Sequence, residues 1–259
     1  AYTDLQPALD AAIAGAEIRV AAGTYKPTEA PDGSTSDRHK AFHFNKNLVL
    51  KGSYNPATNT QDFTNRSILS GDFNDDDVIT GSGSSLSITQ NSENAYHVLI
   101  TEGLTTAAQI EGFLITGGNA NNDSSTISYS GKNFYNYSGG GMYNYSSSPS
   151  IVNTVFSGNS ATSAGGGMRN YSSSRPTIHN SVFYGNGSDI ANTSDSSATG
   201  ANNFSENYSG TGFTALGADP FYDSSNPIGA DGEWFTDDDG LQPSSATSPL
   251  TDAGDITKS

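Results

Sequence analysis

Hydrophobic residues occur along this chain mainly in short runs, and segments rich in Gly, Ser, Asn and Asp separate these runs. One segment near the N-terminus has a helical pattern instead, which Thr3 or Asp4 can cap and Gly15 can end. Its apolar residues recur at every fourth position and form one stripe: Leu5, Leu9 and Ile13. A strand at residues 18–20 follows, so we expect a short helix that covers the open end of a strand-rich structure.

The chain beyond this helix predicts short strands separated by turns. Each run is rich in β-branched and aromatic side chains and is bounded by turn residues. The clearest runs are residues 41–44, 48–50, 67–69, 86–88, 97–101 and 110–116. No helical period intervenes between them, which indicates an all-β chain.

The strongest pattern is an internal repeat. Residues 139–159 read GGGMYNYSSSPSIVNTVFSGN, and residues 165–186 read GGGMRNYSSSRPTIHNSVFYGN. Met142 and Met168 are 26 positions apart, and the offset grows to 27 after Arg175, which is inserted in the second copy. Such near-identity at a fixed offset is typical of a repeat architecture.

A repeat of this length suits one coil of a parallel β-helix with three short strands and three turns. Residues 110–119 form a weaker third copy, and the gap to the next copy predicts a loop at residues 120–138 that bulges from one coil. Stacked coils would place Met on Met, Phe on Phe and Asn on Asn. The asparagine side chains can then form hydrogen bonds along the axis.

The parity of the repeat also predicts a bend. Ile151, Asn153 and Val155 share one face of an extended segment, whereas Phe156 has the opposite parity, so a bend is needed for both sets to face inward. We therefore predict an all-β fold, a right-handed parallel β-helix (solenoid) with a short N-terminal capping α-helix, in a single domain of residues 1–259. Its expected parts are the cap and first strand (1–25), the coils (26–210), and the C-terminal coils with an acidic loop (211–259).

Composition and charge narrow the class of partner. Hydrophobic residues make up only 33% of the 259 residues, yet there are 13 Tyr and 12 Phe, which suits a narrow core better than disorder. The net charge of −16 argues against nucleic acid as a partner and makes calcium an easy one. The chain has no cysteine, no motif for an organic cofactor and no apolar run long enough for membrane insertion.

The repeat GGGM-x-N-x-SSSP-x-I-x-N-x-x-F-x-GN resembles bacterial surface proteins with polymorphic-outer-membrane-protein-like or parallel β-helix repeats. Residues 5–9 (LQPAL) and 18–25 (IRVAAGTY) are similar to the N-terminal cap of the wider pectate-lyase-like superfamily. Residues 217–221 (GADPF) and 248–254 (SPLTDAG) are similar to the last coils of the same exported proteins. The resemblance implies the β-helix fold and secretion or display at a bacterial cell surface. It says little about activity, because the superfamily holds lyases, hydrolases, adhesins and structural fibres.

Two acidic segments are candidate calcium sites. Residues 231–240 read DGEWFTDDDG, and their carboxylates at short spacing beside glycines are what calcium requires. We expect Asp231, Asp237, Asp238 and Asp239 to supply the ligands, with a solvated acidic turn as the alternative. The spacing is not that of an EF-hand. Residues 72–77 form a second acidic run, for which a solvated loop is the favoured interpretation.

Aromatic residues near and within the first repeat are candidate glycan contacts. They alternate with Asn and Ser, and alternation in a strand directs every second side chain to one face. Flat exposed rings can pack against the C–H faces of sugars. The candidates are Tyr135, Tyr137, Tyr143, Tyr145 and Tyr171, and we expect Tyr143 and Tyr145 to share an exposed face. The alternative is that these tyrosines simply form strands and cover the narrow core.

The differences between the two copies gather three basic side chains in one coil. Arg169 and His179 replace Tyr143 and Val152 of the first copy, and Arg175 is the inserted residue. A lyase that acts on uronic acids needs a positive group to neutralise the carboxylate and a base to remove a proton. Drift at exposed positions is the favoured alternative.

These features favour a non-enzymatic secreted or cell-surface module for adhesion, glycan contact or assembly of a surface structure, stabilised by calcium. Its partners would be extracellular glycans or other surface proteins. The alternative is a polysaccharide lyase or glycoside hydrolase with a groove along the coils, and a glycosidase would need two carboxylates across that groove. Self-association through an uncovered end of the stack is a third hypothesis.

Overall fold

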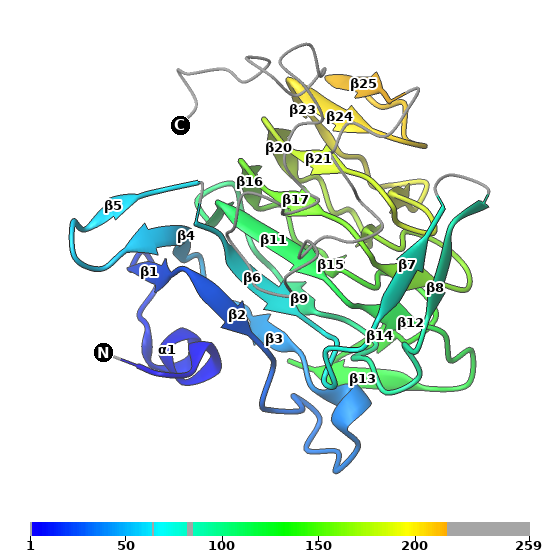
Figure 1. Cartoon of the computed structure of the whole chain (residues 1–259), viewed down its shortest axis with the longest axis horizontal. Helices are drawn as coiled ribbons and strands as arrows, with labels where there is room; N and C mark the ends of the chain where they lie inside the picture. The colour runs from blue at the N-terminus through cyan, green and yellow to red at the C-terminus, as the bar shows by residue number, and fades with distance from the viewer. Residues whose placement is uncertain (1, 64, 82–84, 217–259) are drawn as a thin grey trace.

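The computed structural model describes residues 2–63, 65–81 and 85–216. These residues form an all-β structure with one α-helix and with sheets that are mainly parallel (Figure 1). The class of fold that the pattern of short strands predicts is thereby confirmed. Within the described residues, no helix is long and apolar enough to cross a membrane.

Three sheets contain most of the strands. Sheet A contains β1 (Glu17–Ala21), β4 (Val49–Asn55), β5 (Thr60–Gln61), β10 (Gln109–Glu111), β16 (Ser150–Val152), β20 (Thr177–His179) and β23 (Thr199–Ala201). Sheet B contains β2 (Gly23–Tyr25), β6 (Ser67–Ser70), β11 (Phe113–Thr116), β17 (Val155–Phe156), β21 (Val182–Phe183), β24 (Asn203–Ser205) and β25 (Phe213–Ala215). Sheet C contains β3 (Phe42–Phe44), β9 (Leu99–Glu102), β15 (Met142–Tyr145), β19 (Met168–Tyr171) and β22 (Ile190–Asn192).

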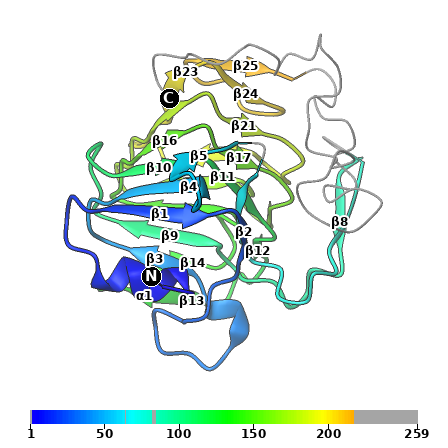
Figure 2. The same cartoon turned by 60° about the vertical axis from the view of Figure 1, so that its left-hand side comes forward.

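The chain visits sheets A, B and C in the same order repeatedly. It passes through β1, β2 and β3, then β4, β6 and β9, and continues in this order to β20, β21 and β22. Each strand pairs in parallel with the corresponding strands of the preceding and following rounds. Figures 1 and 2 show the result as one stack, with α1 at one end and β25 at the other.

The register between rounds is the one that the repeat predicts. Met142 pairs with Met168 in sheet C. The rings of Phe156 and Phe183 stack with their centroids 4.4 Å apart and their planes at 4°. The expected stacking of Met on Met and Phe on Phe is therefore confirmed.

Buried asparagines form hydrogen bonds along the stack, as expected. Asn144 Nδ2 donates to Asn170 Oδ1 at 2.8 Å, and Asn170 Nδ2 donates to Asn192 Oδ1 at 2.9 Å. A second pair joins Asn159 Nδ2 to Asn186 Oδ1 at 3.1 Å. Because Asn144 and Asn170 are fully buried, each amide needs such a partner, and the neighbouring round supplies it.

The bend between sheets A and B occurs at a left-handed residue. Asn153 has φ 50° and lies in the chain between β16 and β17. Ile151 and Phe156 then both lie in the main core, whereas Val155 packs in a second cluster with Leu114. The predicted bend is confirmed, but the expectation that Val155 also faces the main core is wrong.

A glycine divides one predicted strand in the same way. The run at residues 110–116 is two strands, β10 and β11, separated by Gly112 at φ 76°. A side chain there would lie in a left-handed conformation, and its Cβ would be 2.9 Å from the ring of Phe63. Glycine therefore permits the corner that directs β10 into sheet A and β11 into sheet B.

The N-terminal helix α1 (Leu5–Ala11) covers one end of the main core. Asp4 caps it by accepting a hydrogen bond from the Gln6 backbone N–H at 3.2 Å, and Leu5 and Leu9 are buried in the core. Lys46 Nζ donates to three carbonyl oxygens at the helix C-terminus. The expected stripe does not extend to Ile13, which lies beyond the helix and is 78% exposed.

Several small elements lie outside the three main sheets. A short 3₁₀ helix, η1, spans Asp37–His39, and β12 (Asn119–Ala120) pairs in parallel with β18 (Ser160–Ala161). Two antiparallel hairpins also leave the stack: β7 (Val78–Thr80) with β8 (Ser87–Thr89), and β13 (Thr126–Tyr129) with β14 (Lys132–Tyr135). The loop expected at residues 120–138 therefore contains a hairpin.

Candidate functional site

The outer face of sheet C carries the aromatic residues of the repeat. Strand alternation directs Met142 into the main core and the neighbouring Tyr143 and Tyr145 to the opposite face. In the next round, Arg169 and Tyr171 occupy the paired positions. The parallel register thus places Arg169 beside Tyr143 and Tyr171 beside Tyr145.

Hairpin β13–β14 covers part of this face. Ile127 and Phe134 of the hairpin pack in a cluster with Ile100 and Tyr143, and the rings of Phe134 and Tyr143 are 5.2 Å apart in an edge-to-face arrangement. Tyr143 is consequently 0% exposed. The expectation that Tyr143 shares an exposed face with Tyr145 is therefore wrong, because the hairpin occupies the space that a sugar would need.

The other four candidate tyrosines lie together beside the hairpin. Tyr135, Tyr137, Tyr145 and Tyr171 are all partly exposed, and we call them the tyrosine surface. Tyr135 stacks on Tyr137 with centroids 5.2 Å apart and planes at 27°. Tyr171 contacts both Tyr135, at 5.8 Å, and Tyr145, at 5.3 Å.

Two basic side chains lie next to the tyrosine surface. Lys132 Nζ is 5.6 Å from the ring centroid of Tyr145. Arg169 precedes Tyr171 by two residues in β19, and its Nε is buried without a hydrogen-bond partner. The surface therefore combines flat apolar rings with positive charge at its border.

The three basic residues proposed for a lyase are not brought to one site. Arg169 lies in β19 of sheet C, and His179 lies in β20 of sheet A. Arg175 is exposed between these strands, and its Nη2 donates to the Asp195 carbonyl oxygen at 3.1 Å. Their separation follows from the corner between β19 and β20, since consecutive strands of one round belong to different sheets.

His97 lies beneath the hairpin and was not distinguished by the sequence pattern. Its Nδ1 is 2.8 Å from the Gly139 carbonyl oxygen, and its ring packs edge-to-face on Tyr143 at 5.5 Å. Burial lowers the pKa of His97 to about 4, against the hydrogen bond to Gly139, which raises it. The ring is therefore neutral at physiological pH and serves packing.

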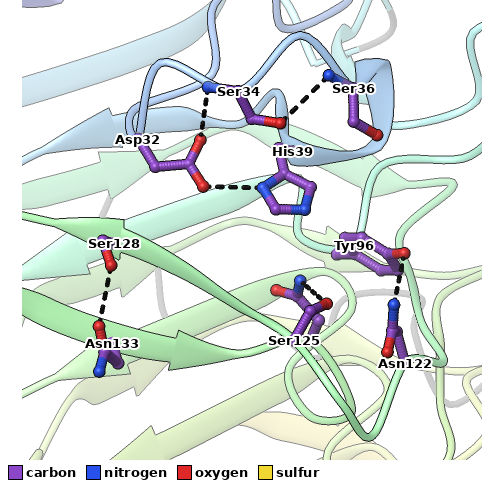
Figure 3. Close-up of polar contacts among 10 residues, drawn as sticks. Asp32, Ser34, Ser36, His39, Tyr96, Asn122, Ser125, Ser128 and Asn133 are labelled. Carbon is purple, nitrogen blue, oxygen red and sulfur yellow. Dashed lines mark hydrogen bonds and ion pairs between the residues drawn. The ribbon is translucent and has the colours of Figure 1, made fainter.

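A loop and the hairpin enclose Tyr96 on the same side of sheet C (Figure 3). His39 Nδ1 is 2.7 Å from Asp32 Oδ2, and the His39 ring packs edge-to-face on Tyr96 at 5.6 Å. The Arg38 guanidinium lies 4.1 Å from the Tyr96 centroid, and Asn122 Nδ2 donates to the Tyr96 hydroxyl at 3.1 Å. These contacts fix the segment that leads into β13.

Further polar contacts hold the hairpin itself in place, as Figure 3 shows. Ser128 Oγ donates to Asn133 Oδ1 at 2.9 Å across its two strands. Asn136 Nδ2 donates to Ser125 Oγ at 2.8 Å where the hairpin begins and ends. Because its strands and its base are both tied, the hairpin carries Tyr135 and Tyr137 in a defined position.

The acidic run at residues 72–77 is partly buried: Asp72 is buried, Asp76 and Asp77 are half-buried, and Asp75 is exposed. One carboxylate oxygen from each of Asp72, Asp76 and Glu93 lies within 4.8 Å of the other two. Burial raises the pKa of Asp77 to about 7, and the nearby charge of Asp72 raises it as well, against a hydrogen bond from Asn94. The sequence pattern missed Glu93, because only the fold brings it beside Asp72.

The four acidic residues expected to bind calcium near the C-terminus lie outside the described residues: Asp231, Asp237, Asp238 and Asp239. No protein-family model, no curated protein and no solved structure matches the chain. In the described part of the chain, the tyrosine surface offers flat apolar rings to a ligand, and the acidic residues near Asp72 offer hard oxygen atoms to a cation.

Proposed function

We propose that this chain is a non-enzymatic module of an exported or cell-surface bacterial protein, and that its tyrosine surface contacts extracellular glycans. We propose further that the fold is a right-handed parallel β-helix. The repeated order of sheets A, B and C and the parallel pairing of successive rounds support this architecture. The resemblance of the repeat to exported bacterial proteins supports the location.

The tyrosine surface carries the functional proposal. Its four rings are partly exposed and lie within 5.8 Å of a neighbouring ring, so they form one apolar platform. Sugars pack their C–H faces on such rings. Hydrogen bonds fix the hairpin that bears Tyr135, and parallel pairing fixes Tyr145 beside Tyr171, so little conformational entropy is lost on binding.

Charge favours neutral glycans over strongly anionic ones. The chain carries a net charge of −16, which repels a polyanion over the range at which a glycan approaches. Lys132 and Arg169 lie at the border of the tyrosine surface. At physiological salt concentration their attraction for an anionic glycan is screened beyond short range. A neutral oligosaccharide pays none of this repulsion and still gains ring contact.

The enzymatic alternative, a polysaccharide lyase or glycoside hydrolase, has less support. A lyase site built from Arg169 and His179 would need side chains of two different sheets to meet. Contact with other surface proteins and self-association are the remaining alternatives.

A glycan-array screen with the whole chain tests the proposal. We expect binding to neutral oligosaccharides that weakens about tenfold or more in Tyr145→Ala and in Tyr171→Ala. Tyr2→Ala is the matched control, because Tyr2 is 62% exposed and lies far along the chain from the tyrosine surface. Release of shorter products from any bound polymer, or undiminished binding by both variants, would overturn the proposal.

A further inference from the structure

The segment that contains hairpin β7–β8 leaves the stack at Gly71 and rejoins it at Ala95, and we call the place where these two ends meet the neck. The chain departs after β6 at Gly71 and returns at Ala95, where the Ala95 backbone N–H donates to the Gly71 carbonyl oxygen at 2.9 Å. Gly71 N–H in turn donates to the Thr116 carbonyl oxygen at 2.9 Å, which ties the neck to the end of β11. The acidic residues are the ones that border this neck.

Both sides of the neck contribute oxygen ligands. Asp72, Asp76 and Asp77 belong to the segment that leads into β7, whereas Glu93 and Asn94 belong to the segment that returns from β8. The oxygens of Asp72, Asp76 and Glu93 all lie within 4.8 Å of one another. Oxygens on opposite sides of a Ca²⁺ ion are about 4.8 Å apart, since each Ca–O distance is about 2.4 Å.

Independent of the acidic charge, a buried amide oxygen at the neck has no donor. Asn94 is 1% exposed, and its Nδ2 donates to Asp77 Oδ2 at 2.8 Å, which holds the amide group at the acidic residues. Its Oδ1 is buried without a hydrogen-bond partner, as are Asp76 Oδ1, Asp77 Oδ1 and Glu93 Oε1. Buried acceptors without a donor are costly, and a cation held among these neighbouring residues would satisfy them.

The neighbouring basic side chains are engaged elsewhere. Lys26 Nζ pairs with Asp75 Oδ2 at 2.6 Å. Arg38 donates to the backbone oxygens of Asn94 and Asn119, at 2.8 and 2.9 Å. These contacts border the acidic residues, and the charge of Arg38 also acts on Glu93, but neither side chain donates a hydrogen bond to the four unpartnered oxygens.

We propose that Asp72, Asp76, Asp77, Glu93 and Asn94 bind one Ca²⁺ ion that clamps the neck of hairpin β7–β8. Oxygen ligands alone favour a hard cation over zinc, which takes nitrogen and sulfur as well. Carboxylate and amide oxygens from two segments suit Ca²⁺, which takes about six to eight oxygen ligands in flexible geometry, better than Mg²⁺, which demands a near-ideal octahedron and keeps several waters. Calcium at the neck does not depend on glycan contact, because the tyrosine surface is built from other residues on sheet C and hairpin β13–β14.

The clamp fixes a hairpin whose described strand residues, apart from Ile79, are exposed or partly exposed. Ile79 is its buried contact with the stack and lies against Gly158, whose added Cβ would be 2.7 Å from the Ile79 side chain. Val78 beside it is 42% exposed. Calcium therefore joins the two ends of the hairpin, and without calcium its carboxylates repel one another.

Calorimetric titration of the whole chain with CaCl₂, after removal of divalent ions by a chelator, tests the site. We expect one Ca²⁺ to bind at the neck, with an affinity about tenfold or more weaker in Glu93→Gln. Asp195→Asn is the matched control, since Asp195 is exposed and accepts a hydrogen bond from Ser173, next to β19 in a later round of the stack. Equal binding of calcium by Glu93→Gln and the unsubstituted chain, or equal binding of MgCl₂ and CaCl₂, would contradict the proposal.

A triple variant separates this site from the acidic segment near the C-terminus. Asp237, Asp238 and Asp239 are changed together to Asn, and we expect the calcium affinity of the neck to persist. Loss of all binding in this triple variant, with full binding in Glu93→Gln, would overturn the assignment.

Stability and hydrogen exchange show whether calcium clamps the hairpin. With calcium present, Glu93→Gln should melt at a lower temperature than the unsubstituted chain. In chelator the order should reverse, because the substitution removes one of the crowded negative charges and keeps the side-chain shape. Calcium should slow amide exchange in strands β7 and β8 of the unsubstituted chain, and should do so much less in the variant. The same order of melting in both conditions would contradict the clamp.

Discussion

The asparagine row in sheet C allows a direct test of how the stack is held together. Asn170 occupies the middle position, accepting from Asn144 Nδ2 at 2.8 Å and donating to Asn192 Oδ1 at 2.9 Å. Asn170→Ala removes both bonds and shortens a side chain that is 0% exposed. The partners then lose their hydrogen bonds while their positions in the neighbouring rounds stay fixed by backbone pairing.

The expected cost is about 2.5 to 4.5 kcal/mol. An unpaired buried donor such as Asn144 Nδ2 costs about 1 to 3 kcal/mol. Asn192 is partly exposed and can hydrate, so its share is smaller, about 0.5 kcal/mol. The space left by the amide group adds about 1 kcal/mol.

Urea unfolding followed by circular dichroism measures this loss. The midpoint should fall in Asn170→Ala with little change in the slope, because the surface exposed on unfolding is nearly the same. Asn133→Ala makes the same chemical change at an exposed position of hairpin β13–β14 and should cost less than about 0.5 kcal/mol. Equal midpoints for the two variants would refute the view that the asparagine row stabilises the stack.

Three further predictions concern the core, a buried histidine and the N-terminal helix. Phe183→Ala removes one ring of the pair stacked at 4.4 Å and should lower the free energy of unfolding, measured in urea, by about 3 to 5 kcal/mol. Phe63→Ala is the control, because the Phe63 ring is 42% exposed, and an equally small loss of stability in both variants would contradict this prediction. Burial lowers the pKa of His97 from 6.5 to about 4, so the unfolded chain binds a proton that the folded chain excludes. Stability should therefore fall by about 3 kcal/mol more in the unsubstituted chain than in His97→Asn between pH 6.5 and 4, and equal pH dependence in urea titrations would argue against it. Lys46→Met removes the donor to three helix carbonyls and should speed amide exchange in α1 several-fold, and unchanged exchange would show that the helix end needs no such partner.

The register of the stack could be predicted from the sequence because identical residues occupy the paired positions of successive rounds. Met142 and Met168, or Phe156 and Phe183, can pair only if the rounds superpose, so a repeated pattern already contains the contact. The capping role of α1 was likewise visible in the spacing of Leu5 and Leu9.

The burial of Tyr143 and the meeting of Asp72 with Glu93 could not be predicted in the same way, because both depend on contacts between dissimilar segments of the chain. Tyr143 becomes buried only because a hairpin from the preceding insertion lies over it. The sequence does contain a local signal for that hairpin, the turn residues Ser130 and Gly131. In the structure their φ angles are 52° and 74°, which suit the tight turn between two short strands. The meeting of Asp72 with Glu93 has no counterpart in the repeat, because it follows from how the neck of hairpin β7–β8 closes.

The hairpins have a consequence for how such a chain can vary. Leu99 in β9 pairs directly with Met142 in β15, although β12 and the whole of hairpin β13–β14 intervene in the chain. Strand pairing sets the spacing between rounds, and the free energy of closing a longer excursion rises only slowly with its length. Excursions at these corners can therefore be lengthened, shortened or exchanged while the scaffold keeps its spacing. Recognition can diversify at the corners, and the buried rows of Met, Phe and Asn need not change with it.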